Sequence, residues 1–256
     1  MVSESLRLAW QVVVRNWTVY RKDFLANISP SIADPALILL ALGFGLSPFI
    51  GEIDGLSYAG YLAPGMIATI ALFTAFFECS YGFYVTLTFE SVFKAMLTTP
   101  IGVNEVILGE FIWVFIRAAL MALGVSIVLL AFGLLPNPAA LVWCPLLAGL
   151  VSLSCGGIGL IASSFVRNIN QFQTIYSFLI SPIFYLSGIF FPVSGIPVLE
   201  YVVQFSPFYH GVRLIQMTVW GNGVFVTYLW HGTILLAFTL VLGAVAFHRI
   251  RKRLVQ

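Results

Sequence analysis

The chain has 256 residues, of which 60% are hydrophobic and only 9% are charged, with a formal net charge of +2. Soluble domains carry about 25% charged residues, so this chain has too few to cover a surface that faces water. The composition excludes an ordinary soluble protein and predicts a membrane protein.

The first predicted element, 4–24, mixes apolar and basic residues. Trp10 and Trp17 share this stretch with Arg7 and Arg15. The pattern is typical of a helix that lies on a membrane surface with its tryptophans at headgroup level. A solvated surface helix is the alternative.

Six later ranges are apolar over the roughly 20 residues that a helix needs to cross a membrane. The ranges are 29–50, 59–85, 106–135, 139–164, 173–191 and 227–248. Ranges longer than about 25 residues must tilt, kink or extend into the interface. We expect an all-α membrane protein with six transmembrane helices.

Lysine and arginine fall almost entirely on one side of these six spans. That side holds Arg7, Arg15, Arg21, Lys22, Lys94, Arg167, Arg249, Arg251, Lys252 and Arg253. The opposite loops hold only Arg213. Because cytoplasmic loops carry the excess of positive charge, both termini are predicted to be cytoplasmic.

The segment 86–104, between the second and third spans, is the most polar internal stretch. Phe93 and Leu97 lie four residues apart, as on one face of a short helix, and Thr99-Pro100 ends it. The predicted topology places this helix in the cytoplasm, where it is a candidate docking surface.

The segment 192–226 is too apolar for an ordinary exposed loop. Pro192, Pro197 and Pro207 divide it into pieces that are too short to span a membrane. Irregular backbone is tolerated at membrane depth only where protein or a cavity covers it. We therefore predict re-entrant or interfacial helices on the outer face.

Four ionisable residues lie inside the apolar spans, where charge is costly and indicates a functional site. They are Asp34, Glu78, Glu110 and Arg117. The short connection between the second and third spans makes these two spans antiparallel neighbours. Arg117 is then expected to pair with Glu78 or with Glu110, either to lock the bundle or to contact substrate and gate its passage.

Aromatic residues gather at the fifth span and just after it. They include Tyr176, Phe184, Tyr185, Phe190 and Phe191. An interfacial belt with core packing is one interpretation. The other is a substrate pathway that accepts a lipid tail or stacks on sugar rings.

Several kinds of chemistry are missing from the sequence. It has no Gly-x-x-x-x-Gly-Lys-Ser/Thr phosphate loop, no His-Glu-x-x-His and no Gly-x-Ser-x-Gly. We predict no catalytic residue and no metal site. The central parts of the last three spans hold no charge, which argues against an ion-driven carrier. A transporter of this kind needs a partner that supplies energy.

Four stretches, in order along the chain, carry a resemblance to a known family. They are Asp34-Pro35 with Gly43-Phe-Gly45; Tyr61-Leu-Ala-Pro64-Gly65; Glu90 to Pro100 with Gly109-Glu110; and Ser187-Gly188 to Pro192 with Ser206-Pro207 to Arg213. Together they resemble the membrane permease subunit of type-2 ABC exporters, which include O-antigen, capsule and drug permeases. Within the family the sequence looks most like the NodJ-like permeases, which are associated with lipo-oligosaccharide export.

The resemblance implies one transmembrane domain over 1–256 in a bacterial inner membrane. It implies a homodimer with two cytoplasmic ABC ATPase subunits, which bind ATP and Mg, while this chain holds no cofactor. The segment 90–101 then looks like a coupling helix, with Glu90, Phe93, Lys94, Leu97, Thr99 and Pro100 as the residues that meet the ATPase. The pathway would be lined by the first, second and fifth spans.

The expected function is therefore the permease subunit of an ATP-driven exporter, not an enzyme in its own right. The preferred substrate is amphipathic, such as a lipid-linked oligosaccharide. Efflux of hydrophobic drugs by the same family is one alternative, and a non-transporting membrane scaffold is another.

Overall fold

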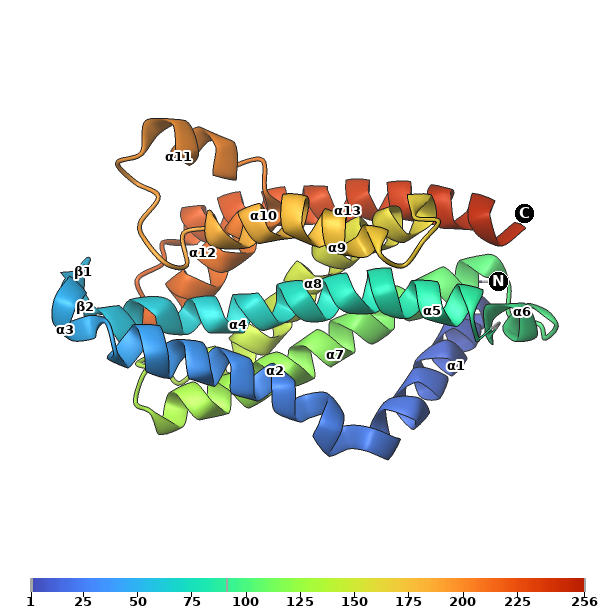
Figure 1. Ribbon diagram of the computed structural model, residues 1–256, viewed down its shortest axis with the longest axis horizontal. Helices are drawn as coiled ribbons and strands as arrows, with labels where there is room; N and C mark the ends of the chain where they lie inside the picture. The colour runs from blue at the N-terminus through green and yellow to red at the C-terminus, as the bar shows by residue number, and fades with distance from the viewer. Residues whose placement is uncertain (1, 91, 256) are drawn as a thin grey trace.

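The computed structural model of the protein describes residues 2–90 and 92–255, and the side chains of all of these except residues 2, 3, 30–32, 94, 254 and 255. Nearly all of the described chain is helical, and the long helices lie side by side in one bundle (Figure 1). α6 (Val92–Leu97) lies at the same end of the bundle as the start of α1 and the end of α13.

The chain starts with α1 (Val2–Tyr20), whose apolar face packs on α7 (Val103–Ala131). Ala9, Val12 and Val13 are buried there. The two helices approach closely because Gly109 of α7 has no side chain: a Cβ at that position would lie 2.6 Å from the Cβ of Val12. The contact therefore anchors α1 to the bundle.

After α1 the chain bends at the 3₁₀ turn η1 (Arg21–Asp23) and continues toward the end of the bundle opposite α6, as Figure 1 shows. α2 (Phe24–Ile38), the π-helical η2 (Leu39–Phe44) and the short α3 (Ser47–Ile50) then run along the bundle. This helical passage begins before 29, where the sequence pattern begins its first apolar range.

A small antiparallel hairpin, β1 (Glu52–Ile53) and β2 (Leu56–Ser57), leads into the second long helix. That helix consists of α4 (Tyr58–Phe77), the π-helical η3 (Glu78–Gly82) and α5 (Phe83–Thr88). The Ser57 side chain caps its start by accepting a hydrogen bond from the Gly60 N–H.

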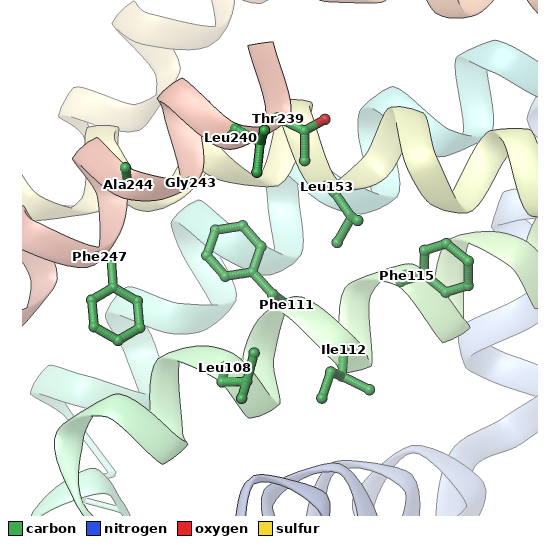
Figure 2. Close-up of a pocket in the computed structure, with 10 residues that line it drawn as sticks. All are labelled: Leu108, Phe111, Ile112, Phe115, Leu153, Thr239, Leu240, Gly243, Ala244 and Phe247. Carbon is green, nitrogen blue, oxygen red and sulfur yellow. The ribbon is translucent and has the colours of Figure 1, made fainter. Parts of the chain in front are cut away.

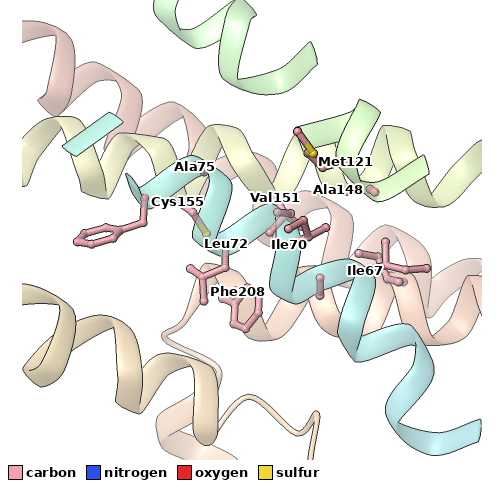
Figure 3. Close-up of a cluster of buried hydrophobic side chains, with 14 of the residues drawn as sticks. Ile67, Ile70, Leu72, Ala75, Met121, Ala148, Val151, Cys155 and Phe208 are labelled. Atoms are coloured by element: carbon pink, nitrogen blue, oxygen red, sulfur yellow. The ribbon is translucent and has the colours of Figure 1, made fainter. Parts of the chain in front are cut away.

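The centre of the bundle is α8 (Ala140–Phe165), which packs against α4, α7, α12 (Pro207–Trp220) and α13 (Phe225–Val255). Small residues make this possible, since a Cβ at Gly159 would lie 3.1 Å from the carbonyl oxygen of Phe76. Met121, Val151 and Phe208 are among the buried side chains at this core (Figure 3).

Five helices in the described part of the chain are long and apolar enough to cross a membrane. The predicted fifth span, 173–191, is not among them. It is a shorter helix made of α9 (Gln171–Ile175), the π-helical η4 (Tyr176–Ile180) and α10 (Ser181–Tyr185). Gly188, at φ +81°, turns the backbone out of the helical direction. The all-α membrane fold is as predicted, whereas the layout of six spans stays a prediction.

The segment predicted as outer helices contains α11 (Pro197–Val203) and α12. Each begins with proline at its first turn, where the missing N–H costs nothing. α11 carries exposed apolar side chains, including Val198 and Tyr201, whereas α12 is buried against α8. Both lie toward the end of the bundle opposite α6 (Figure 1).

Candidate functional site

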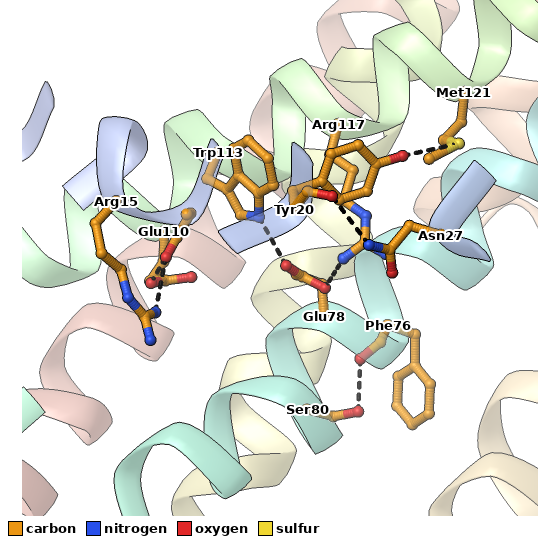
Figure 4. A network of polar contacts seen from close by, with 11 residues as sticks. Arg15, Tyr20, Asn27, Phe76, Glu78, Ser80, Glu110, Trp113, Arg117 and Met121 are labelled. Atoms are coloured by element: carbon orange, nitrogen blue, oxygen red, sulfur yellow. Dashed lines mark hydrogen bonds and ion pairs between the residues drawn. The ribbon is translucent and has the colours of Figure 1, made fainter. Parts of the chain in front are cut away.

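Charged and polar side chains from three elements meet between α1, η3 and α7. This polar cluster consists of Arg15, Asn16, Tyr20, Glu78, Glu110, Trp113 and Arg117 (Figure 4). The cluster brings together Glu78, Glu110 and Arg117, which lie inside otherwise apolar ranges of the sequence.

Glu78 is held by two donors from α7. Arg117 donates to its Oε2, and the indole Nε1 of Trp113 donates to its Oε1 at 2.7 Å. The Arg117 guanidinium also lies 5.1 Å from the centre of the Tyr20 ring, within the range of a cation–π contact. Of the two pairings that the sequence left open, the structure has Glu78 with Arg117.

Glu110 is buried and takes part in a different chain of contacts. It accepts a hydrogen bond from the Asn16 amide at 3.0 Å, and Arg15 donates to the oxygen of the same amide at 2.9 Å. Arg15 in turn lies 3.7 Å from Glu90. These contacts connect Glu110 of α7, through Asn16 and Arg15 of α1, to Glu90, the first of the predicted coupling residues.

Four residues of the cluster, Arg15, Asn16, Tyr20 and Trp113, are not among the site residues predicted from the sequence. Asn16 lies on the face of α1 that also carries Val12 and Val13, which are buried. A polar side chain at helical spacing within an apolar stripe is a usable signal for a buried partner. Trp113 offers no such signal, because its role depends on how η3 places Glu78.

Two hollows adjoin the Glu78–Arg117 pair. The smaller, of 180 Å³, is lined by the polar cluster and by Glu90 and Phe93. The larger, of 520 Å³, lies among α2, α4 and η4 and is lined by Asp34, Pro35, Leu37, Ile38, Thr69, Ile70, Phe73, Thr74, Phe77, Glu78, Arg117 and Tyr176. Since both linings include Glu78 and Arg117, the ion pair lies between them.

Asp34 is exposed and lines the larger hollow, with Pro35 beside it. No contact joins it to Glu110 among the described side chains. In the structure, therefore, Glu78 pairs with Arg117. Asp34 lines the larger hollow with them but does not join the pair. Glu110 instead forms its hydrogen bond with Asn16 of α1.

Four of the five predicted pathway aromatics form a continuous row. The Tyr176 ring stacks on Phe77 at 5.6 Å, Phe184 lies 5.1 Å from Phe73, and further ring contacts add Tyr185 and Phe190. No ring contact joins Phe191 to the row in the described chain. The row extends from the larger hollow toward the end of the bundle opposite α6.

The predicted coupling residues divide into buried and exposed groups. Phe93 of α6 is buried and packs on Phe83 with ring centres 4.8 Å apart, and Leu97 is partly buried. Glu90, Thr99 and Pro100 are exposed. The side chain of Lys94 lies outside the described residues. Phe93 thus anchors α6 to the bundle, and the exposed residues form the available surface.

π-helical segments occur in three of the long helical passages: η2 after α2, η3 after α4 and η4 after α9. Among the described residues, α7, α8 and α13 carry none. Such segments are found frequently at functional sites. They fall in the first, second and fifth passages, which also line the larger hollow.

Hydrogen bonds to backbone carbonyls hold the end of the bundle opposite α6. Tyr61 Oη donates to the Gly188 carbonyl at 2.9 Å, Gln216 Nε2 to the same oxygen at 3.2 Å, and Tyr58 Oη to the Phe190 carbonyl at 3.2 Å. Together with the contact between His210 Nε2 and the Gln204 carbonyl, we call this set the carbonyl joint. It ties α4 and α12 to the chain after α10.

The buried His210 and His231 bring their Nδ1 atoms within 2.8 Å of each other. His210 Nε2 lies 2.9 Å from the Gln204 carbonyl, so it must donate there. Neutral His210 then accepts at Nδ1, and His231 donates from its Nδ1. The sequence does not predict this contact, because the two histidines are 21 residues apart and lie on different helices. The described residues hold no group of three or more possible metal ligands.

A further pocket, of 460 Å³, is bounded by α7, α8 and α13 (Figure 2). Among the described residues that line it, Thr239 alone carries a polar side chain. The pocket contains none of the predicted site residues, and its apolar lining offers no group for chemistry.

Comparison with known proteins identifies the family of this chain. The profile of the ABC-2 type transporter family matches residues 7–220. The chain belongs to this family. Its members are the permease components of ABC transporters, which work with an ATPase subunit, so the chain is a permease rather than a catalytic subunit.

Named relatives cover most of the chain. It is 32% identical over 251 residues to nodulation protein J of Rhizobium leguminosarum bv. viciae, covering 97% of this chain and 96% of the relative. It is 29% identical over 209 residues to nodulation protein J of Rhizobium meliloti (81% of this chain, 79% of the relative). The inner membrane transport permease YadH of Escherichia coli is 21% identical over 220 residues (84% and 81%).

Proposed function

We propose that this ABC-2 permease forms a homodimer in a bacterial inner membrane and exports an amphipathic molecule, with ATP hydrolysed by two copies of a separate ABC ATPase subunit. Both termini and α6 face the cytoplasm in this proposal, since the basic residues of the chain's ends and connections lie on that side. ATP and Mg are bound by the partner, and this chain holds no cofactor.

The observation that carries the proposal is the position of the Glu78–Arg117 pair. It lies between the larger hollow, where we expect substrate, and the smaller hollow, which Glu90 and Phe93 help to line. A movement of α6 reaches Arg15 through Glu90 and reaches the Glu78 environment through the packing of Phe93 on Phe83. The ion pair thus gates the hollow in response to the ATPase.

The exposed surface formed by Glu90, Thr99 and Pro100 is the proposed contact with the ATPase. Lys94, whose side chain lies outside the described residues, keeps its sequence-based assignment to this contact. Leu97 and Phe93 hold α6 in place from the other side. The helix is short, so a push on this surface moves it as a unit against α5.

The larger hollow and the aromatic row suit a substrate with an apolar tail and a polar head. Asp34, Thr69 and Thr74 supply polar groups, and Phe73, Phe77 and Tyr176 supply flat apolar surface. The relatives named nodulation protein J favour a lipo-oligosaccharide over a drug. Drug efflux is the second candidate, supported by the largely aromatic and aliphatic lining of the same hollow.

The test is to produce the chain together with its ATPase partner and reconstitute the complex in proteoliposomes. We expect vanadate-sensitive ATP hydrolysis that a fluorescent lipo-oligosaccharide stimulates, together with ATP-dependent movement of that substrate. Stimulation by a hydrophobic dye alone would favour drug efflux. A chain that purifies without any P-loop ATPase and moves neither substrate would support the non-transporting scaffold instead.

Charge reversal at the coupling surface sharpens this test. Glu90→Lys should uncouple ATP hydrolysis from transport while leaving the chain in the membrane, and Glu52→Lys is the matched control because Glu52 is also exposed but lies in the hairpin at the opposite end. Equal loss in both variants, or transport unchanged by Glu90→Lys, would contradict the docking assignment.

A further inference from the structure

A second charged site lies apart from the polar cluster, between the end of α8 and the last turns of α13. This basic cleft has a volume of 420 Å³ and is lined by Ser164, Phe165, Val166, Arg167, Arg249, Lys252 and Arg253. Four of its seven lining residues are cationic and none is acidic. The transport scheme above makes no use of it.

The cations of the basic cleft are positioned by aromatic rings. The Arg249 guanidinium lies 4.6 Å from the centre of the Phe165 ring, and that of Arg253 lies 5.3 Å from the centre of the Tyr84 ring. These contacts orient the guanidinium groups without neutralising them. The site is therefore preformed and strongly positive.

No carboxylate balances this charge in the described part of the chain, where the two ion pairs are Arg15–Glu90 and Glu78–Arg117. One terminal nitrogen of Arg253 is buried and has no hydrogen-bond partner among the described residues. A buried donor without a partner is costly. An anion with several acceptor oxygens would satisfy it and offset the clustered positive charge.

The face of α13 that carries Arg249 is apolar in the turns that precede Arg249. Phe238, Leu242 and Val245 precede Arg249 at intervals of three and four residues, so all four share one face. Phe238 and Leu242 line a mostly apolar pocket of 350 Å³ shared with α8 and α10. Leu242 and Arg249 are separated by about 10 Å along the helix, which is less than the length of one acyl chain.

We propose that the basic cleft binds the phosphate headgroup of an anionic phospholipid, whose acyl chain lies along the Phe238–Val245 face of α13 toward this pocket. Arginine suits the phosphate because its guanidinium forms two parallel hydrogen bonds to phosphate oxygens. Basic pockets between helices at a membrane surface bind lipid headgroups in this way. The proposal requires only that the chain lies in a membrane, and it does not depend on the substrate or on the ATPase.

The experiment uses the full chain, purified in detergent and depleted of lipid, and titrates it with phosphatidylglycerol or with neutral phosphatidylcholine while native mass spectrometry counts bound lipids. Phosphatidylglycerol should bind preferentially. Arg249→Gln and Arg253→Gln should each lower its affinity about fivefold, with no change for phosphatidylcholine.

The matched control is Arg251→Gln. It removes the same charge from the same turn of α13, but Arg251 is exposed and does not line the cleft. Its affinity for phosphatidylglycerol should stay within twofold of the unmodified chain. A melting temperature that is unchanged in lipid-free detergent checks that all three variants are folded.

Three results would overturn the proposal. Equal weakening by Arg251→Gln would show that only the general positive charge matters. Displacement of phosphatidylglycerol by an equal concentration of inorganic phosphate would show that the acyl chain contributes nothing and that the ligand is a free anion. Unchanged lipid binding together with loss of a copurifying ATPase subunit would make the basic cleft a protein interface.

Discussion

The two ends of the helical bundle are held together by different kinds of interaction. Near α6 the polar cluster relies on charge, with Glu78 bound to Arg117 and Arg15 near Glu90. At the opposite end the carbonyl joint relies on neutral donors and backbone acceptors, such as Tyr61 and Gln216 on the Gly188 carbonyl. Neither end lacks polar groups, so the difference lies in their kind.

This difference has a consequence for motion. A backbone carbonyl cannot change its charge, and the tyrosine and glutamine donors of the carbonyl joint stay neutral and bound unless the helices separate. An ion pair is sensitive to neighbouring charges and to water entering beside it. The polar cluster, with hollows on both sides of its ion pair, is the end that a partner can switch, whereas the carbonyl joint keeps α4 and α12 in register.

The largest effect is expected from breaking the ion pair. Arg117→Gln leaves the Glu78 carboxylate without its cation in a site where both side chains are mostly buried, at 24% and 20% exposure for Glu78 and Arg117. We expect a loss of roughly 3 kcal/mol in the free energy of unfolding, measured by thermal unfolding in detergent. Arg21→Gln, an exposed arginine, is the control and should change little.

The exchange of both residues, Glu78→Arg with Arg117→Glu, distinguishes an ion pair that only stabilises the bundle from one that also gates the larger hollow. If the pair only locks the bundle, the exchange restores transport and the ion pair's share of the stability, whereas the Trp113 hydrogen bond to residue 78 stays lost. If the pair gates the larger hollow, stability returns while transport does not. An Arg117→Gln variant as stable as the original chain would contradict the role of this pair as a lock, and one that also transports normally would contradict its role as a gate.

A smaller loss is expected at the carbonyl joint, from a change that adds no charge. A Cβ at Gly65 would lie 2.4 Å from Cγ2 of Ile189, the residue between the two acceptor carbonyls of Gly188 and Phe190. Gly65→Ala should therefore cost about 2 kcal/mol through overpacking, measured by the same unfolding assay. Gly243→Ala is the matched control, since nothing lies within 4 Å of its new Cβ. Equal stability of both variants would show that the joint has room to adjust.

The sequence predicts the polar cluster better than it predicts the carbonyl joint, for a physical reason. Charged residues in apolar helices are conspicuous, and Glu78 and Arg117 could be expected to pair because their spans are adjacent. Asn16 lies at helical spacing within the apolar stripe of α1, which is a usable signal, whereas the hydrogen bond of Trp113 depends on where η3 places Glu78. Arg117 pairs with Glu78 rather than with Glu110, and Glu78 lies in the π-helical turn η3. No residue type in Glu78–Gly82 predicts a π-helical turn, so this pairing could not be read from the sequence.

The carbonyl joint could not be predicted because half of each bond is backbone. Gly188 and Phe190 become acceptors only after α10 ends at Tyr185 and the chain turns. The helix also ends before the predicted range 173–191 does, because hydrophobicity continues through Phe191 although the helix stops at Tyr185. Apolar length predicts burial in a membrane, and it does not by itself predict where a helix stops.

A still smaller effect at the carbonyl joint should follow from acidification. Burial lowers the pKa of His210, which faces His231 of α13 and has Tyr209 and Arg213 nearby on α12. The unfolded chain then binds more protons than the folded one, so stability present above pH of about 6.5 is lost as the pH falls below it. The slope cannot exceed about 1.4 kcal/mol per pH unit for one proton.

Unfolding measured at pH 7.5 and pH 5.5 checks this dependence. His210→Gln should reduce it, and the exposed His248→Gln should leave it unchanged. A pH dependence that survives in His210→Gln would assign the titration to another group.

The smallest change in stability should come from Glu90→Gln, although its effect on transport should be large. Glu90 is 51% exposed in its side chain and lies 3.7 Å from Arg15, so the pair contributes less than about 1 kcal/mol. Thermal unfolding should therefore hardly change, while ATP hydrolysis in the reconstituted complex no longer drives transport. Glu52→Gln, exposed in the hairpin at the other end, should preserve both. A loss of stability as large as that of Arg117→Gln would make Glu90 part of the structural cluster. Loss of coupling at full stability would instead show that Glu90 transmits the movement of the ATPase without stabilising the fold. Glu90 would then be the residue that connects the polar cluster to the exposed surface beside α6.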